Sequence, residues 1–262
     1  MTIRQHKFAM IRPLALLSSL VFSWCAGCRP ASAAQPATAA SQAGGGDPIQ
    51  VLVVGGRGHD WNGFYKTIDP VLRKTGDFQL TLTANLDDLK SGSLANYKVV
   101  LFYGNGGDFG DPKQEAGLDQ FVRGGGGMAG VHATDAFKQS DVYWRLLGGR
   151  FITHSGGRFW LRIDDHNHPV TAGMRDFEIQ DETYTSQYHP DFKLHSLGHI
   201  DRGSEQQSMV WTQDYGKGRV FNTTLGHDGA AWTNPNFQRL LARGLYWAAG
   251  REPREIPAAK AQ

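Results

Sequence analysis

The chain has 262 residues, a formal net charge of +2 and only two cysteines, Cys25 and Cys28. Because both cysteines lie close to the amino terminus, disulfide bonds cannot hold a later domain together and a cysteine nucleophile cannot serve it. Residues 1–33 contain four basic and no acidic residues, so the formal charge of the remainder falls from +2 to −2, which argues against a nucleic-acid partner.

Residues 1–33 are predicted to be an export signal. Basic residues precede an apolar core, PLALLSSLVFSW at residues 13–24, which is too short to anchor the chain across a membrane. Two endings remain open: ASA at residues 31–33 fits the ordinary signal peptidase, whereas CAGC at residues 25–28 resembles a bacterial lipobox with Cys28 as the lipidated residue. We therefore expect an exported protein, either periplasmic or anchored to the membrane as a lipoprotein through Cys28.

Residues 34–48 are rich in Ala, Gly, Pro and Ser. They are expected to form a flexible linker, because they cannot bury enough apolar surface to become ordered. One domain is predicted at residues 49–253, since no second linker interrupts it. Residues 254–262 are expected to be a frayed tail.

The first half of this domain alternates apolar runs typical of strands with segments that have apolar residues at helical spacing. Pro70 lies inside the first helical segment and predicts a kink or a division into two short turns. In chain order we predict a strand at 49–54, a helix at 61–76, a strand at 78–83, a helical turn at 86–89, a strand at 98–104, a helix at 112–125, a strand at 128–131 and a helix at 141–148.

This alternation predicts an α/β fold with a mostly parallel sheet, right-handed crossovers and helices on both faces. Ligands of such sheets bind at the carboxyl ends of the strands. Polar residues follow three of the expected strands. The fold would therefore place four residues on one rim: His59, Asp60, Asp108 and His132.

The second half has the pattern of short strands with little helix between them. We expect these strands to be partly antiparallel, which would add an antiparallel extension to the sheet. A closing helix is predicted at 235–248, with an apolar face that packs on the sheet. The strands are predicted at 158–164, 177–179, 194–200, 208–211 and 219–226.

His132 directly follows the expected strand at 128–131. The spacing Gly130-x-His132-x-Thr134 approximates the strand-to-helix turn at which α/β hydrolases and amidotransferases hold their nucleophile. A histidine there is better suited to moving a proton or holding a metal ion than to covalent attack. The alternative is a histidine that only ties the strand to the following loop.

Other polar residues are candidates for the same rim. The run DETY places two adjacent carboxylates, Asp181 and Glu182, beside Tyr184. Successive residues of an extended chain point to opposite sides, so only one carboxylate can face a given pocket. His227 follows an expected strand, and His154 precedes a glycine pair. For each of them the alternative is a solvated turn or surface residue.

Aromatic residues and cofactor motifs give weaker signals. Trp61 and Trp232 lie at expected loop ends and could stack on a sugar ring, although most such residues belong to a core. The predicted domain contains no nucleotide-binding motif and no HExxH or GxSxG sequence. A divalent metal held by scattered histidine and glutamate ligands remains open.

Five blocks of the sequence, in order, resemble the trehalose-utilisation, ThuA-like, family. They are GGGGMAGVHATDAF, YWRLLGGRFITH, HPVTAGM, DETY and YGKGRVFNTTLGHDGAAWTNPNFQRLLARGLYWAAG. The resemblance covers about residues 49–250 and implies a flavodoxin-like, doubly wound fold, shared with class I glutamine amidotransferases but without their cysteine nucleophile. By similarity, the family's recurring polar residues correspond to His132, His154, Glu182 and His227, and its first-loop histidine to His59.

The resemblance also implies a role in the use of trehalose, related disaccharides or keto-glycosides, with a small-molecule carbohydrate as partner. The first hypothesis is a His/Glu acid–base enzyme, a hydrolase, lyase or isomerase, in which His132 is acid or base and Glu182 its partner. A non-catalytic sugar-binding or accessory module and a metal-dependent hydrolase are the alternatives. The candidate catalytic residues are His132, Glu182, His227 and His154, and the candidate substrate-binding residues are His59, Asp60, Asp181, Tyr184 and Trp232.

Overall fold

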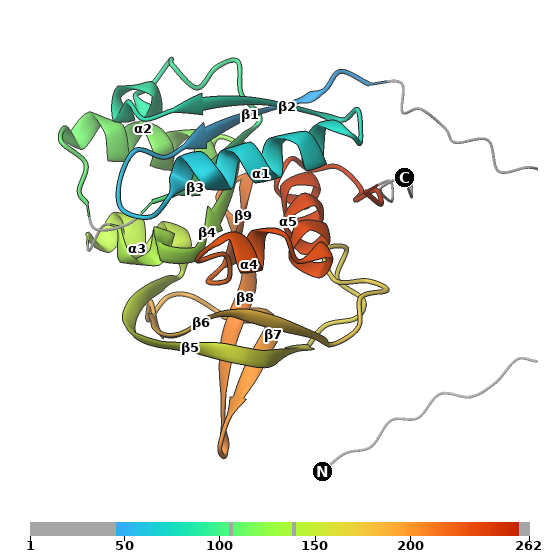
Figure 1. Ribbon diagram of the computed structural model, residues 1–262. Helices are drawn as coiled ribbons and strands as arrows, with labels where there is room; N and C mark the ends of the chain where they lie inside the picture. The colour runs from blue at the N-terminus through green and yellow to red at the C-terminus, as the bar shows by residue number, and fades with distance from the viewer. Residues whose placement is uncertain (1–45, 105–106, 138–139, 257–262) are drawn as a thin grey trace, which may run out of the picture. The chain divides into compact units, whose positions relative to one another are not determined.

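A nine-stranded sheet forms the centre of the described part of the chain (Figure 1). The structure is a computed structural model and describes residues 46–104, 107–137 and 140–256, so the predicted signal and most of the linker lie outside it. None of the helices in these residues is long and apolar enough to span a membrane. The elements are β1 (Ile49–Val54), α1 (Trp61–Arg73), β2 (Phe78–Thr83), the 3₁₀ helix η1 (Leu86–Leu89), β3 (Val99–Tyr103), α2 (Pro112–Arg123), β4 (Gly127–Val131), the 3₁₀ helix η2 (His132–Ala136), α3 (Asp141–Leu147), β5 (Gly149–Ile163), β6 (Phe177–Tyr188), β7 (His195–Arg202), β8 (Glu205–Tyr215), β9 (Gly218–Thr223), α4 (Gly229–Trp232) and α5 (Pro235–Ala248).

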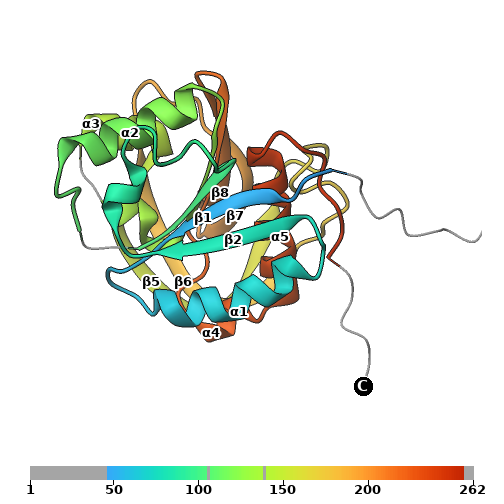
Figure 2. The same cartoon turned by 90° about the horizontal axis from the view of Figure 1, so that it is seen from above.

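Half of the sheet is parallel, in the order β2-β1-β3-β4-β9. Alternate residues of these strands face opposite helix layers. In β1, Val51 and Val53 pack in a core with α1 and α5, whereas Leu52 and Val54 pack in a second core with α2 and α3. Figure 2 shows the two helix layers on either side of the strands. The prediction of a doubly wound, mostly parallel sheet is confirmed.

The other half of the sheet is the predicted antiparallel extension, in the order β9-β8-β7-β5-β6. Its strands differ from the prediction in length, because β5 has 15 residues and β6 has 12. The prediction followed apolar runs, whereas much of β5 is exposed or half-buried and β6 alternates buried with more exposed residues. As a consequence, His154 and Glu182 lie on paired strands rather than in loops or turns.

Two local expectations also differ from the structure. Helix α1 continues through Pro70, where the backbone hydrogen bond that proline cannot make would have gone to the exposed residue Lys66. The expected tail is held at its start rather than frayed: Arg254 pairs with Asp77 at 3.1 Å, and Glu255 pairs with Arg243 at 2.7 Å. Residues 257–262 lie outside the described part.

Asp135, in η2, is a buried carboxyl group in the core beneath the rim. Its Oδ2 accepts a hydrogen bond from Ser186 Oγ at 3.1 Å, whereas its Oδ1 has no hydrogen-bond partner among the described residues. Burial raises the pKa of this carboxyl to about 7. Folding therefore favours the neutral acid over the carboxylate at this position.

We predict that Asp135 makes the protein less stable as the pH rises from about 4 to about 7. In that window the unfolded chain has released the proton while the folded chain keeps it, so the free energy of unfolding falls by up to about 1.4 kcal/mol per pH unit. Asp135→Asn keeps the shape without the charge and should lack this fall. Urea unfolding of both proteins at several pH values from 4 to 8 measures it, and equal pH dependence in the two proteins would contradict it.

Candidate functional site

His132 stands at the carboxyl end of β4, in a backbone conformation that residues with side chains rarely adopt. Its φ is 55°, and no other non-glycine residue of the described part has a positive φ. Thr134 holds the turn, because its hydroxyl accepts the Val131 N–H at 3.1 Å and donates to the Phe102 carbonyl at 2.7 Å. The predicted sharp turn is therefore present, and it carries the imidazole off the strand end.

Hydrogen bonds fix the protonation of the His132 ring. Nδ1 lies 3.0 Å from the carbonyl oxygen of Thr224, and because a carbonyl only accepts, Nδ1 carries the hydrogen. Nε2 is then the acceptor, and the Tyr184 hydroxyl donates to it at 3.0 Å. Burial lowers the pKa of this fully buried histidine to about 3. The ring is thus neutral at physiological pH and turns a lone pair towards the rim.

Two more histidine rings pack edge-on against His132. The ring centroids of His59 and His227 lie 4.6 and 5.2 Å from that of His132 and 5.0 Å from each other. One ring nitrogen of each histidine lies within 4.8 Å of the other two. The loops that follow β1 and β9 and the end of β4 thus bring three imidazoles to one point. These three residues are the histidine triad below.

Glu182, from β6, joins the triad to a fourth histidine. Its Oε2 is 3.6 Å from His132 Nε2, and its Oε1 is 3.4 Å from both His227 Nε2 and His154 Nδ1. The four predicted catalytic residues therefore converge, together with His59. His154 is the most exposed of them, with half of its side chain accessible to solvent.

Asp181 and Glu182 face opposite ways, as the strand alternation predicts. Asp181 is buried, and its carboxylate accepts hydrogen bonds from the backbone N–H groups of Gly226 at 2.7 Å, His227 at 3.0 Å and Glu182 at 2.8 Å. Burial raises its pKa to about 6, and the three N–H donors oppose that rise. Asp181 therefore holds the backbone that carries His227.

The backbone carbonyl groups of Gly226 and His227 also have hydrogen-bond partners. The Tyr103 hydroxyl lies 3.0 Å from the Gly226 oxygen and 3.1 Å from the His227 oxygen, and Trp232 Nε1 donates to the Gly226 oxygen at 2.7 Å. Tyr103 and Thr224 were not among the predicted site residues. Tyr103 could have been found in the sequence, because a tyrosine at the end of an apolar strand needs a polar partner for its hydroxyl. Thr224 could not, because it contacts His132 through its backbone carbonyl, which any residue would supply.

The remaining predicted substrate-binding residues lie away from a binding surface or have structural contacts. Tyr184 and Trp232 are buried, at 3% and 5% exposure, so neither offers a face on which a sugar could stack. Asp60 caps α1 by accepting the Gly63 N–H at 2.8 Å. Asp108 is exposed.

A pocket of 350 Å³ lies against Glu182 and His227. Small-molecule sites start at about 300 Å³, so this pocket can hold a compact polar ligand. Its wall is formed by two glycines and by residues with polar side chains. The lining residues are Gly156, Gly157, Gln180, Asp181, Glu182, His227 and Asp228.

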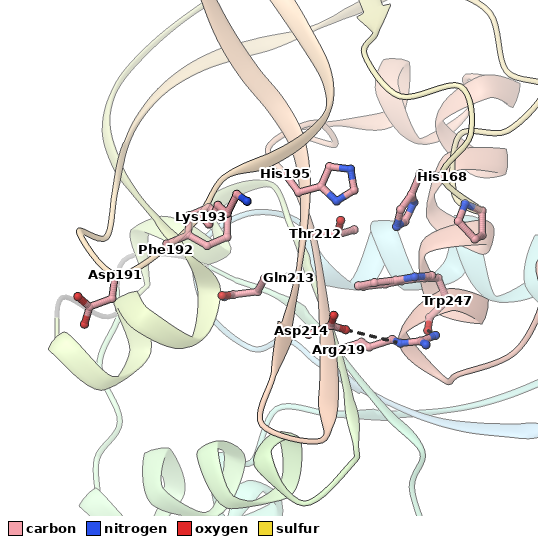
Figure 3. Close-up of a pocket in the computed structure, with 11 residues that line it drawn as sticks. His168, Asp191, Phe192, Lys193, His195, Thr212, Gln213, Asp214, Arg219 and Trp247 are labelled. Carbon is pink, nitrogen blue, oxygen red and sulfur yellow. Dashed lines mark hydrogen bonds and ion pairs between the residues drawn. The ribbon is translucent and has the colours of Figure 1, made fainter. Parts of the chain in front are cut away.

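A larger pocket of 530 Å³ lies at the other end of β9, where Arg219 pairs with Asp214 at 3.9 Å. Figure 3 shows His168, His195 and Trp247 around this hollow. It contains none of the predicted site residues. We place the functional site at the smaller pocket, because the carboxyl ends of the parallel strands and the converging ionisable groups are there.

The model of the ThuA family, described as trehalose utilisation, matches residues 50–248. The chain belongs to the ThuA family. This confirms the resemblance seen in the sequence. No curated protein matches the chain.

Solved structures agree with this family in fold. A ThuA-like protein from Parabacteroides merdae is 23% identical, with a TM-score of 0.70 over 80% of this chain and 94% of that one. One from Bacteroides uniformis is 19% identical, with a TM-score of 0.64 over 82% and 95%. A β-galactosidase from Rahnella sp. R3 is 12% identical, with a TM-score of 0.58, and the match covers 79% of this chain but 32% of the enzyme. These likenesses show the fold.

We predict that Asp181→Asn destabilises this ThuA-family protein by about 1–3 kcal/mol at pH 8. The amide nitrogen cannot accept, so at least one backbone N–H at Gly226 or His227 loses its buried partner. Urea unfolding measures the change. The control is Asp228→Asn, because exposed Asp228 caps α4 through the Ala230 N–H and asparagine caps about as well. Equal stability of the Asp181→Asn and wild-type proteins would contradict the assigned role.

Proposed function

We propose that this ThuA-family protein is an exported enzyme of carbohydrate use that moves a proton on a sugar or keto-glycoside, with Glu182 as the group that takes the proton. The observation that carries the proposal is the position of Glu182. It contacts three histidines at 3.4–3.6 Å and also lines the pocket.

Glu182 is better placed than His132 to act as the base. His132 is fully buried, both of its ring nitrogens have partners, and its low pKa makes it a weak base. Glu182 has 19% of its side chain accessible, and a carboxylate between imidazoles can accept a proton and pass it on. In this proposal His132 is a fixed, neutral neighbour of Glu182 and does not itself take the proton.

His154 and His227 supply the complementary group. Both lie 3.4 Å from Glu182 Oε1, and their side chains are 50% and 34% accessible. When a C–H bond beside a ketone loses its proton to Glu182, the bonding electrons move to the ketone oxygen as an enolate. An imidazole N–H beside that oxygen stabilises the negative charge or protonates it.

Two observations support a carbohydrate as the substrate. The family is described as trehalose utilisation. The pocket also offers the amide of Gln180 and the carboxylate of Asp228, which are groups that hydrogen-bond to sugar hydroxyls. A pure binding module would have no need of a carboxylate enclosed by imidazoles, and this favours the enzyme over the non-catalytic alternative.

We predict that Glu182→Gln lowers turnover by about 10²–10⁴-fold, the usual contribution of a general base, while substrate binding changes little. The assay follows deuterium uptake from D₂O beside the ketone of 3-keto-trehalose by NMR, with trehalose tested in parallel for release of glucose. The control is Glu178→Gln on the same strand, because Glu178 only pairs with Arg158 at the surface. Wild-type activity in the Glu182→Gln protein, or no turnover of any keto-glycoside or disaccharide by the wild type, would refute the proposal.

Export is a separate part of the proposal and rests on residues 1–33. We predict that the mature protein in a bacterial host begins either at lipidated Cys28 or at Ala34, as mass spectrometry of the amino terminus will show. In the first case Cys28→Ser abolishes labelling by palmitate and removes the protein from the membrane fraction. In the second case the substitution changes neither. An unprocessed chain in the cytoplasm would contradict export.

A further inference from the structure

The histidine triad has the composition of a metal site, and its nitrogens lie nearly close enough together for one. Ligand nitrogens on a tetrahedral zinc ion at about 2.1 Å are about 3.4 Å apart, and the triad nitrogens already lie within 4.8 Å of one another. His59 and His227 are on loops and only partly buried. Small side-chain rotations of these two would therefore close the remaining gap around the fixed His132 ring.

The contacts of the second ring nitrogen, Nδ1, in His132 and His227 also support a metal site. A metal-binding histidine usually donates its second ring N–H to a carbonyl or carboxylate, which fixes the nitrogen that faces the ion. His132 Nδ1 donates to the Thr224 carbonyl at 3.0 Å, and His227 Nδ1 lies 3.5 Å from Asp228 Oδ2. In both rings Nε2 is the nitrogen on the side of Glu182, and it would be the ligand atom.

We propose that His59, His132 and His227 bind one divalent transition-metal ion, and that Glu182 stands beside the open coordination position. Three imidazoles select ions such as Zn²⁺, Co²⁺ or Mn²⁺ over Mg²⁺ and Ca²⁺, which prefer oxygen ligands. Three protein ligands with a neighbouring carboxylate is a common arrangement for a catalytic rather than a structural ion. The catalytic part of this inference rests on the proposed function: such an ion would polarise the keto or hydroxyl oxygen of the sugar.

Tyr184 would compete with a metal ion for His132. Its hydroxyl donates to His132 Nε2 at 3.0 Å and so occupies the lone pair that a metal would take. Binding must displace this hydrogen bond. Tyr184→Phe removes the competitor without touching a ligand, so it should bind the ion at least as tightly as the wild type.

The experiment titrates the full chain with Zn²⁺ by calorimetry after EDTA treatment, with Cys25 and Cys28 alkylated so that their thiols bind no zinc. Co²⁺ absorption reports the ligand geometry, and Mg²⁺ is the negative control. We expect one equivalent of Zn²⁺. His59→Ala and His227→Ala should each weaken binding by more than about 100-fold, the upper end of what loss of an outer-shell partner costs. These two residues are less buried than His132, so their variants are better suited to keep the fold.

The matched controls are His195→Ala and His199→Ala. These histidines pair with Asp165 and Asp164 in a separate group, so the variants should bind Zn²⁺ as the wild type does. The inference is overturned if the wild type binds neither Zn²⁺ nor Co²⁺, if the triad variants bind as tightly as the wild type, or if a control variant loses the ion instead.

The outcomes also separate this inference from the proposed function. If the protein catalyses deuterium exchange but binds no Zn²⁺ and is unaffected by EDTA, the metal site is refuted and the proposed acid–base enzyme stands. One equivalent of Zn²⁺ that depends on the triad, with no exchange or turnover on any sugar, would establish the metal site and refute the enzyme. Glu182→Gln should keep the ion and lose the exchange, because Glu182 is not one of the three ligands.

Discussion

The hydrogen bond from His132 Nδ1 to the Thr224 carbonyl is the contact on which the site depends. It follows from the register of two neighbouring parallel strands. Val131 of β4 is paired with Thr223 of β9, so the next residue of each strand, His132 and Thr224, meet at the carboxyl edge of the sheet. The left-handed backbone at His132 costs of order 1 kcal/mol or more, and this bond, with the enclosed ring, offsets it. Because the bond fixes both the orientation and the tautomer of the ring, an unprotonated Nε2 lies near Glu182 and the Tyr184 hydroxyl.

The candidate site takes residues from both halves of the sheet: His59, His132 and His227 follow parallel strands, and Glu182 lies on antiparallel β6. On β6, Glu182 and Tyr184 are two residues apart and therefore share a face, and both reach His132 Nε2. Asp181 points the other way and holds the backbone of Gly226 and His227. The alternation of side chains along the strand thus directs the Glu182 carboxylate towards the histidines and the Asp181 carboxylate towards the backbone of Gly226 and His227. An exchange of their order along the chain would leave the histidines without their carboxylate.

The sequence allowed the parallel half to be predicted closely, because strands buried on both faces are continuous apolar runs. The predicted strands at 49–54 and 78–83 and the closing helix at 235–248 have the observed bounds. It did not allow the lengths of β5 and β6 to be predicted, since most residues of β5 are exposed or half-buried and only alternate stretches of β6 are buried, so neither strand is a continuous apolar run. The convergence of His59, His132, His154, Glu182 and His227 was predictable from strand ends and family resemblance. The burial of Trp232 was not, because aromatic residues at loop ends look alike in sequence whether they face a ligand or the core.

The solvent accessibility of the side chains increases from His132 outward across the candidate site. The side chain of His132 is 0% accessible, Glu182 19%, His227 34% and His154 50%. In the proposed reaction, a sugar that entered beside Gly156 and Gly157 would contact Glu182 and His227, which line the pocket, whereas His132 does not line it. The strand end carries His132, and the sequence has no cysteine beyond residue 28. In the proposed reaction, His132 supplies a fixed, neutral imidazole, and Glu182 would exchange the proton, because its side chain is held between histidines and yet is 19% accessible.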